Sequence, residues 1–198
     1  MLQARDIGFS YGTRPVLSHV DFAVAPNERV AIAAASGRGK TTLCRILAGY
    51  LEPQMGEVVL DGAPLARRGP APVQMVWQHP ERVLDPLMTM EQSLAQCPCD
   101  RETLASLRAS IGVRDEWLTR RPRELSGGEL QRVCIVRALA CEPRYLVCDE
   151  ISTMLDAVTQ ADLWERLLAW AREREAGMVV VTHSAALRER IATRVVEL

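Results

Sequence analysis

Residues 31–42 read AIAAASGRGKTT. It matches the phosphate-binding pattern G-x-x-x-x-G-K-[ST] at every fixed position except the first, where Ala34 stands in place of glycine. An apolar run precedes the glycines, and the run LCRILAGYL (43–51) after them has helical spacing and ends near Gly49. A strand, a glycine-rich loop and a helix are therefore predicted in the order that such a loop requires.

The loop has the groups needed to hold a polyphosphate. Backbone N–H groups at a helix N-terminus form an anion site, and Gly37 and Gly39 leave no Cβ in its way. Lys40 can reach the terminal phosphates of a nucleotide, and the Thr41 hydroxyl can coordinate Mg²⁺. A Gly/Ser turn with a chance lysine is the structural alternative. If the position of Ala34 demands a glycine-only conformation, its Cβ costs about 1–2 kcal/mol. That is a roughly ten- to thirtyfold loss of affinity or rate, which would slow an enzyme without inactivating it.

Length, composition and charge indicate one globular domain. The chain has 198 residues, of which 48% are hydrophobic and 25% are charged, so disorder is not expected. The net charge is −1 and no long basic block occurs, so we expect no nucleic-acid partner. The start, MLQARDIGFSYG (1–12), is too polar for a secretory leader, and the apolar runs are far shorter than the roughly 20 residues that span a bilayer. Work at a membrane would therefore need a partner.

Six cysteines occur without a paired C-x-x-C arrangement. They are Cys44, Cys97, Cys99, Cys134, Cys141 and Cys148. We expect buried free thiols in a reducing compartment. Cys97 and Cys99 could hold a metal with outside help, but two thiolates alone are too few for a structural zinc site.

Short strands are predicted in the first third of the chain, where apolar and polar residues alternate between turn signals. They fall within 3–12, 18–35 and 56–65. APNE (25–28) breaks the second of these segments, and a turn at Asp61-Gly62 falls in the last. APVQMVWQHP (71–80) is predicted to be a buried strand, and charged helical segments follow it to about Pro122.

Strands and helices are predicted to alternate through the C-terminal half. Helices are expected within 127–143, stopping before Pro143, and within 159–177, ended by Gly177; strands are expected within 144–150, 178–184 and 194–198. Leu130, Val133, Val136 and Ala140 fall on one side of the first helix. This alternation predicts a mainly parallel sheet.

Polar side chains follow three of the predicted strands. YLVCDE closes with Asp149 and Glu150, VVVTHS contains His183, and VQMVWQ closes with Gln78. Open α/β sheets bind ligands at the carboxyl ends of their strands. Asp149 can hold Mg²⁺, and Glu150 can orient and deprotonate an attacking water. These residues could instead have structural roles. The two acids could be helix caps or salt-bridge partners, His183 could be a structural histidine with its hydrogen bonds satisfied, and Gln78 could be a polar residue at which a strand ends.

The stretch ELSGGELQRVCIVRALACEPRYLVCDE (124–150) joins a further motif to the acidic strand. Ser126 is a good helix N-cap, so a Ser-Gly-Gly turn that begins a helix is the structural interpretation. A capping role alone does not explain why the phosphate-binding loop, this turn and the acidic strand end occur in this order along one chain. Leu125 to Glu129, followed by Gln131-Arg132, resembles the signature motif of ATP-binding cassette (ABC) ATPases, and the resemblance covers nearly the whole chain.

The resemblance implies a role for each matching residue. Residues expected to bind ATP are Tyr11, which stacks on adenine, Ser36, Gly37, Arg38, Gly39, Lys40, Thr41 and Thr42 of the loop, and Ser126, Gly127 and Gly128 of the signature. Residues expected to hold Mg²⁺ are Thr41, Gln78 and Asp149. Residues expected to act in catalysis are Lys40, Gln78, Glu150, Asp156 of the D-loop (153–156) and the switch histidine, His183. ATP and Mg²⁺ are thus the expected cofactors.

The resemblance also implies the architecture. We expect an α/β fold with a P-loop NTPase core, a mainly parallel sheet, an N-terminal antiparallel β-subdomain and a short helical subdomain inserted at roughly 80–127. Together they would form a single nucleotide-binding domain over 1–198. Members of this family hold two ATPs between two head-to-tail domains. A second ABC ATPase subunit, identical or different, is therefore an expected partner, because its signature turn supplies a second anion site.

The expected function is that of an ATP-hydrolysing subunit that powers solute transport, with import favoured, through separate membrane permease subunits. A solute-binding protein fits that arrangement, as does a cytoplasmic position on the inner face of a bacterial-type membrane. The segment WQHPERVLDPLMTMEQSL (77–94) resembles the oligopeptide, dipeptide and nickel importer branch. Its structural alternative is a proline-punctuated loop before a helix capped near Thr89.

Some features depart from the family pattern. Ala34 replaces a glycine, and Ile151 and Met154 stand where a proline and a small residue are commoner. The helical region is short, and the chain ends soon after His183, without the further segment of many relatives.

Two alternative functions are a soluble ABC ATPase that does work other than transport and a weakly active nucleotide-dependent regulator. The chain has no coiled-coil insertion or second cassette, which favours transport, and the retained Glu150 and His183 favour an active enzyme.

Overall fold

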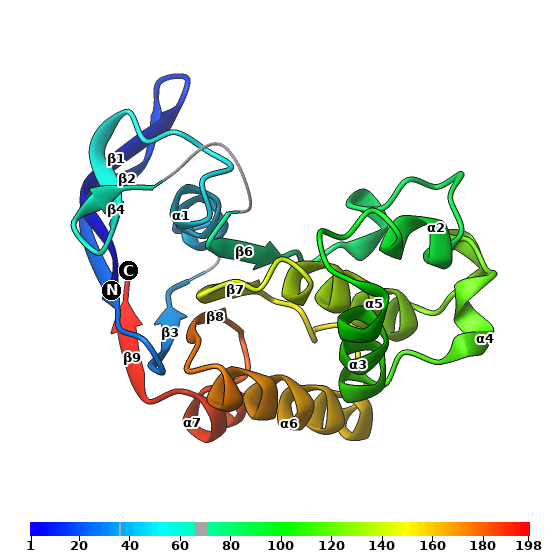
Figure 1. Cartoon of the computed structure of the whole chain (residues 1–198). Helices are drawn as coiled ribbons and strands as arrows, with labels where there is room; N and C mark the ends of the chain where they lie inside the picture. Colours follow the sequence, from blue (N-terminus) through cyan, green and yellow to red (C-terminus); the bar gives the residue numbers. More distant parts are fainter. Residues whose placement is uncertain (36, 66–70) are drawn as a thin grey trace.

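The computed structural model describes residues 1–35, 37–65 and 71–198. Within these residues the strands form an antiparallel sheet in the order β2-β1-β4-β5 and a parallel sheet in the order β6-β7-β8-β3-β9 (Figure 1). The antiparallel strands are β1 (Leu2–Tyr11), β2 (Arg14–Val24), β4 (Met55–Leu60) and β5 (Ala63–Pro64). The parallel strands are β3 (Arg29–Ala33), β6 (Val73–Val76), β7 (Tyr145–Asp149), β8 (Gly177–Val181) and β9 (Arg194–Glu197). The predicted α/β fold, with its N-terminal antiparallel sheet, is confirmed.

The turn that joins β4 to β5 follows the predicted chemistry. Asp61 and Gly62 both have a left-handed backbone, with φ of 52° and 84°. A two-residue hairpin turn of this kind matches the twist of its strands, and Asp-Gly is a favoured pair for it. Leu60 and Ala63 are consequently paired across the hairpin.

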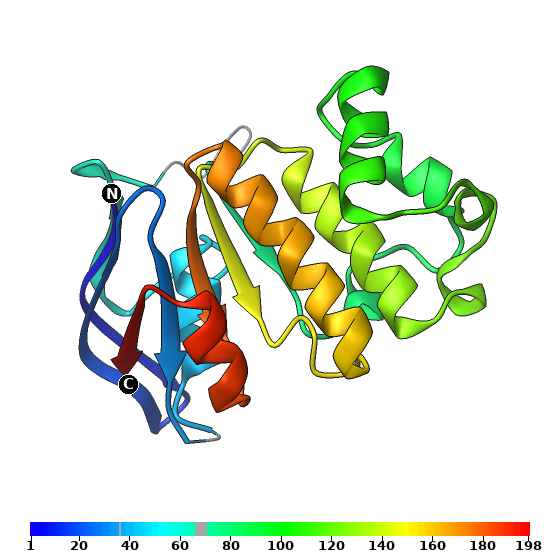
Figure 2. The same cartoon turned by 90° about the horizontal axis from the view of Figure 1, so that it is seen from below.

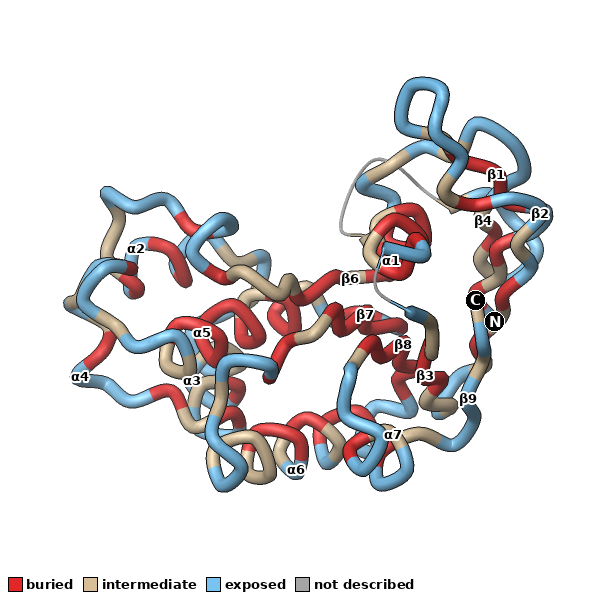
Figure 3. Tube along the Cα trace, turned by 180° about the vertical axis from the view of Figure 1, so that it is seen from behind, coloured by how far each residue is buried: buried red, intermediate tan, exposed pale blue. Residues whose placement is uncertain are grey.

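Helices cover the two faces of the parallel sheet separately. Helix α1 (Lys40–Leu47) packs between the two sheets, while α5 (Gly127–Leu139), α6 (Ala157–Glu173) and α7 (Ala185–Ile191) share the core on the other side. Alternate residues of β7 reach the two cores: Tyr145 and Val147 join the α1 side, and Leu146 and Cys148 the α5 side. Figure 3 shows the buried strands in the middle of the molecule. Their near-continuous apolar sequences reflect burial on both faces.

Between β6 and α5 the described chain forms only helices and turns. These helices are η1 (Pro80–Arg82), α2 (Met90–Leu94), α3 (Arg101–Ile111), α4 (Asp115–Leu118) and η2 (Pro122–Glu124). They lie at the end of the molecule away from both termini (Figure 2). The predicted cap at Thr89 is confirmed, because its hydroxyl accepts a hydrogen bond from the backbone N–H of Gln92 at 3.2 Å.

Two expectations from the sequence are wrong. Helix α6 ends at Glu173, not at Gly177, and Gly177 is the first residue of β8. The chain leaves the helix where Glu175 takes a left-handed conformation, with φ of 51°. The cysteines are not all buried: Cys44, Cys134 and Cys148 are, but the others, Cys97, Cys99 and Cys141, are partly exposed.

The described residues contain neither a metal cluster nor a membrane span. Across 1–35, 37–65 and 71–198, nowhere do three or more His, Cys, Asp or Glu side chains group so as to hold a metal ion, and the Cys97–Cys99 segment is no exception. None of the helices in these ranges combines the length and apolarity that crossing a bilayer requires.

Candidate active site

Strands β3, β6, β7 and β8 run parallel, so their carboxyl ends meet at one edge of the sheet. The glycine-rich loop follows β3, and Gln78 comes soon after β6. Asp149 ends β7, with Glu150 next to it, and His183 comes two residues after β8. The structure therefore brings residues predicted from distant parts of the sequence to one place.

The loop after β3 takes the backbone shape that its glycines allow. Gly37 and Gly39 have φ of 77° and 89°, and Gly39 is the N-cap of α1. A Cβ on Gly39 would lie 2.7 Å from Cδ2 of Leu17 and 3.0 Å from the backbone oxygen of Val16. Both the left-handed backbone and the close approach of β2 therefore require glycine at this position. Ser36 lies outside the described residues.

Lys40 points back into its own loop. The residue is 7% exposed, and Nζ donates hydrogen bonds to the backbone oxygens of Ala34 at 2.9 Å and Ala35 at 3.1 Å. The ammonium group thus lies at the mouth of the loop, beside the N-terminus of α1. An anion placed there would meet the lysine charge and the helix dipole together.

Ala34 does not occupy a glycine-only conformation. Among the described residues, the non-glycine residues with positive φ are Asp6, His19, Asn27, Asp61, Glu142, Glu150 and Glu175. Because Ala34 is not one of them, the condition on which the ten- to thirtyfold penalty depends is not met. Backbone strain gives no reason for Ala34 to weaken the loop.

Glu150 is held by two of the other predicted residues. Nε2 of Gln78 donates a hydrogen bond to one of its carboxylate oxygens at 2.9 Å, and Nε2 of His183 lies 2.7 Å from the other. The Glu150 side chain is 13% exposed and that of His183 is 54% exposed. Glu150 also has a left-handed backbone, with φ of 53°, and such strained residues cluster at functional sites. A carboxylate oriented in this way, at an open edge, can accept a proton from a water molecule.

Asp149 is buried with one oxygen unpaired. The residue is 2% exposed, and Oδ1 has no hydrogen-bond partner. Burial raises the pKa of this carboxyl, and the neighbouring Thr41 hydroxyl opposes that shift. A buried oxygen without a partner is costly unless a ligand satisfies it. Together with the Thr41 hydroxyl it offers the hard oxygen donors that Mg²⁺ takes, so the residues fit that ion.

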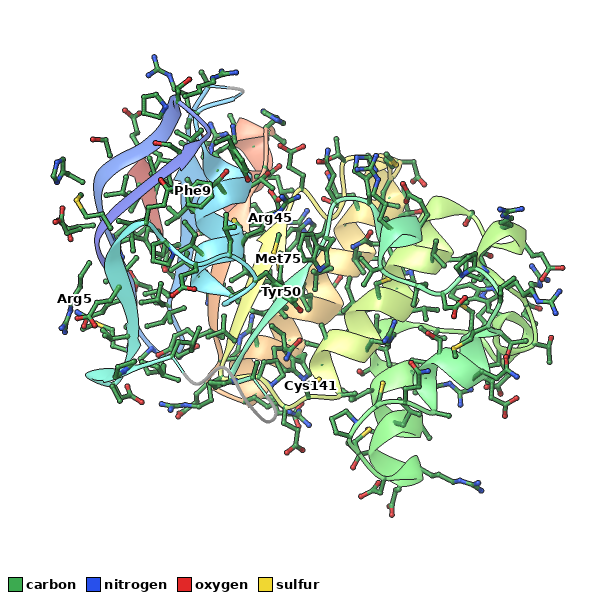
Figure 4. All side chains as sticks on the ribbon, turned by 90° about the horizontal axis from the view of Figure 1, so that it is seen from above. Arg5, Phe9, Arg45, Tyr50, Met75 and Cys141 are labelled. Carbon is green, nitrogen blue, oxygen red and sulfur yellow. The ribbon has the colours of Figure 1, made fainter. Side chains whose placement is uncertain are left out.

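A groove of about 380 Å³ opens beside Thr41 and Asp149. Its remaining lining is Arg45, Tyr50, Trp77, Gln78, His79, Arg82 and Val83. The rings of Tyr50 and Trp77 meet edge to face at 5.1 Å, and the Arg45 guanidinium lies 5.3 Å from the Trp77 ring centre. Figure 4 shows Arg45 and Tyr50 in the middle of the molecule, between the antiparallel sheet and the helical region.

The aromatic and basic residues that line this groove were not predicted from the sequence. One signal was available: Arg45 comes four residues after Thr41, so both face the same side of α1. Tyr50 and Trp77 carried no comparable pattern, because each meets the groove only through the tertiary fold.

The Ser-Gly-Gly turn caps α5, as predicted. The Ser126 hydroxyl accepts a hydrogen bond from the Glu129 backbone N–H at 3.3 Å, and the Glu129 carboxylate accepts one from the Ser126 N–H at 2.7 Å. Ser126 and Gly127 are exposed, and Gly128 is half-buried. Since α1 and α5 pack on opposite faces of the parallel sheet, the turn and the Lys40 loop belong to different sides of the molecule.

The remaining predicted residues have local surroundings. The Tyr11 ring is 50% exposed and packs edge to face on Phe9 at 5.0 Å, near the β2 segment that touches Gly39. Arg38 is exposed, while Thr42 is buried in the α1 core. Asp156 caps α6 by accepting hydrogen bonds from the backbone N–H groups of Val158 and Thr159, both at 3.0 Å, so its carboxylate is engaged by the first turn of that helix.

Known proteins resemble this chain in sequence. The family model described as ABC transporter matches residues 17–153. The nickel import ATP-binding protein NikE of Escherichia coli O6:K15:H31 (strain 536 / UPEC) is 35% identical over 209 residues, covering 95% of this chain and 77% of that protein. The aliphatic sulfonates import ATP-binding protein SsuB 1 of Xanthomonas axonopodis pv. citri (strain 306) is 37% identical over 189 residues, covering 92% of this chain and 74% of that protein.

Solved structures share the fold. An ATP-binding subunit of an ABC transporter superposes with a TM-score of 0.85 at 27% identity, covering 100% of this chain and 85% of that one. The ATP-binding cassette MJ0796, in a dimeric post-hydrolysis state bound to ADP and Pi, gives a TM-score of 0.85 at 25% identity, covering 100% of this chain and 94% of that one. The chain therefore belongs to the ABC transporter family, as an ATP-binding and ATP-hydrolysing subunit.

Proposed function

We propose that this sheet edge is the ATP-hydrolysing site, that Mg²⁺ assists there, and that a second ABC ATPase subunit completes it. The observation that carries the proposal is the Glu150 carboxylate, held by Gln78 and His183 beside the buried Asp149. Hydrolysis needs a base that is oriented toward the attacking water. The two contacts orient this carboxylate, and 13% of the Glu150 side chain remains exposed.

Binding of the triphosphate falls to the loop and to α1. Lys40 exchanges its bonds to the Ala34 and Ala35 carbonyls for bonds to phosphate oxygens, which are charged and therefore stronger acceptors. The backbone N–H groups that would surround the phosphates belong to Gly37, Arg38, Gly39, Lys40, Thr41 and Thr42. Ser36, which lies outside the described residues, is proposed from the sequence alone. Tyr11 offers an exposed ring on which adenine can stack.

Asp149, Thr41 and Gln78 would hold Mg²⁺, which neutralises phosphate charge when bound. The unpaired Oδ1 of Asp149 supports this assignment, as does the position of Thr41 beside it. Glu150 accepts a proton from the attacking water, while Gln78 and His183 keep its two oxygens in place. Asp156 keeps the D-loop shaped by capping α6.

The composite site requires a second subunit, identical or different. Ser126, Gly127 and Gly128 would approach the phosphates of that subunit's ATP. Two observations support this: they form the N-terminus of α5, and they lie on the opposite side of the sheet from their own loop. The nucleotide-binding domain would span 1–198, with the helices at roughly 80–127 as its helical subdomain.

The work powered by hydrolysis is solute import through separate membrane permease subunits. The relatives support import, because their names describe nickel and sulfonate import proteins. The groove beside Gln78 offers a docking surface for a cytoplasmic segment of the permease. The subunit would then work in the cytoplasm at the inner face of the membrane, and a solute-binding protein would deliver the substrate. A nickel- or peptide-type substrate is proposed from segment 77–94.

An ATPase assay with Glu150→Gln tests the catalytic assignment. We expect kcat to fall by about 100-fold or more, with ATP binding retained because the Lys40 loop is unchanged. Glu165→Gln, at an exposed position on α6, is the matched control and should keep full activity. Equal turnover of Glu150→Gln and the unmodified chain would refute the role of Glu150.

A further inference from the structure

A buried glutamine on α5 contacts the strand end that carries Gln78. Gln131 lies one helical turn after Gly127, and the residue is 3% exposed. Its Nε2 atom donates a hydrogen bond to the backbone oxygen of Trp77, 3.2 Å away. An unpaired polar group at this depth would be costly, so the bond fixes where the two elements meet. It joins α5 to the residue that directly follows β6.

This bond ends one residue from the catalytic cluster. Trp77 precedes Gln78, whose Nε2 donates to the Glu150 carboxylate at 2.9 Å. On its other side, the Trp77 ring packs against Tyr50 and Arg45 in the groove. Because the peptide unit between Trp77 and Gln78 is planar, fixing the Trp77 carbonyl restricts the position from which the Gln78 side chain starts.

We infer that Gln131 is a positioning residue, which fixes the Trp77–Gln78 backbone to the signature helix and so holds the Gln78 amide against Glu150. The inference rests on the proposed function of Glu150 and of the Ser-Gly-Gly turn. That turn and Gln131 lie within two turns of one helix, so displacement of the turn by a nucleotide displaces Gln131 as well. The orientation of Glu150 therefore depends on whether the signature turn is engaged.

Gln131→Met tests the inference, because methionine keeps the side-chain length and removes the donor. We expect kcat to fall about five- to tenfold, the effect of one buried hydrogen bond. The KM for ATP should change by less than about twofold, since the Lys40 loop is untouched. Gln74→Met on β6 is the matched control: it removes an amide-to-carbonyl bond of the same 3.2 Å length, to Ala71, which does not join β6 to α5. Its kcat should be unchanged.

A double-mutant cycle separates positioning from a general structural role. If Gln131 acts through Gln78, then Gln131→Met has no further effect on kcat when Gln78→Ala is already present. A general loosening of α5 would instead lower kcat by the same factor in both backgrounds. If Gln131→Met fails to fold, Gln131→Asn replaces it, since asparagine keeps the amide and shortens its reach.

The outcomes distinguish this inference from the function on which it rests. No turnover by the unmodified chain, alone or with its partners, would overturn the proposed function and the inference together. Turnover by the unmodified chain, combined with a Gln131→Met variant that is fully active or additive with Gln78→Ala, overturns the inference alone. Loss of kcat that disappears in the Gln78→Ala background supports both.

Discussion

The side chain of Lys40 already has two oxygen acceptors, and both are backbone carbonyls of its own loop. The residue is already buried, being 7% exposed. When a phosphate replaces the two carbonyls, the ammonium group therefore turns toward it, and its burial changes little. Neutral carbonyls bind an ammonium group more weakly than phosphate oxygens do. A triphosphate in the loop would therefore offer Lys40 stronger acceptors than the ones it now has.

Ala34→Gly should change the ATPase rate by less than about twofold. The reason is that Ala34 is outside the left-handed region, so glycine relieves no backbone strain. Steady-state kcat and KM, measured side by side on the two proteins, check this prediction. A tenfold gain of activity would mean instead that the alanine methyl group obstructs the nucleotide.

At the residue scale, the sequence predicted what depends on strand ends and missed what depends on packing. Asp149, Glu150, His183 and Gln78 follow separate strands, and a parallel sheet must bring such positions to one edge. Tyr50 and Trp77 meet in the groove only because α1 packs beside β6, and no local pattern encodes that contact.

Helix α5 begins with two glycines that have different surroundings. A Cβ on Gly127 would meet nothing within 4 Å, whereas one on Gly128 would lie 2.9 Å from Cδ2 of Leu155 in the D-loop. The signature turn and the D-loop of one chain are therefore in contact through Gly128. A substitution at one glycine should not be equivalent to the same substitution at the other.

Gly127→Ala should stabilise the protein by up to about 1 kcal/mol, because alanine favours the helix and reduces the entropy of the unfolded chain. Gly128→Ala should gain less or destabilise, since Leu155 must move. Thermal unfolding of the two variants, followed by far-UV circular dichroism, compares them directly. Equal melting temperatures of the two variants would show that the Leu155 side chain moves aside without loss of stability.

Helices α3, α5 and α6 are joined by a charged network around Asp162. Nη2 of Arg132 donates to the Asp162 carboxylate at 2.7 Å, and Nη1 donates to the Ile111 backbone oxygen at 2.6 Å. Burial works against ionisation of Asp162, but the hydrogen bonds from Arg132 and Arg166 hold its pKa below the ordinary value. This network connects the helical region to the core.

Asp162→Asn should destabilise the protein by about 1–2 kcal/mol at pH 7. The loss arises because the buried Arg132 loses its charged partner, and it stays modest because solvent screens the half-exposed carboxylate. A lowered folded-state pKa contributes stability above the unfolded value and loses it as the pH falls. The difference from the unmodified chain should therefore shrink below about pH 4. Urea unfolding from pH 7 to 3 measures this, with Glu165→Gln on the same helix as the control. A difference that stays constant with pH would contradict the assignment.

At the element scale, the order and type of the elements were predictable, and some of their ends were not. Glycine-rich and Asp-Gly turns and the Thr89 cap follow from local chemistry, and the structure has them where the sequence predicts. Helix α6 ends before Gly177 because Glu175, a residue without turn preference, takes the left-handed conformation. Partial exposure of Cys97, Cys99 and Cys141 likewise depends on how the helical region packs.

For the whole molecule, the feature that matters most for function is that the two hydrophobic cores lie on opposite faces of the parallel sheet. The Lys40 loop leads into α1 on one face of the parallel sheet, and the Ser-Gly-Gly turn leads into α5 on the other. Both motifs are readable in the sequence, but their separation follows from the alternation of side chains along β7 and β8. This separation is what the proposed two-subunit site requires.

The most direct measurement is a structure of the Glu150→Gln variant with ATP and Mg²⁺, in the assembly that it forms with its second cassette. We expect a triphosphate on the Lys40 loop of one subunit, with Ser126 of the partner subunit within hydrogen-bond distance of its terminal phosphate. A structure in which ATP is bound and the Ser-Gly-Gly turn lies remote from every triphosphate, in each assembly, would contradict the proposed two-subunit site.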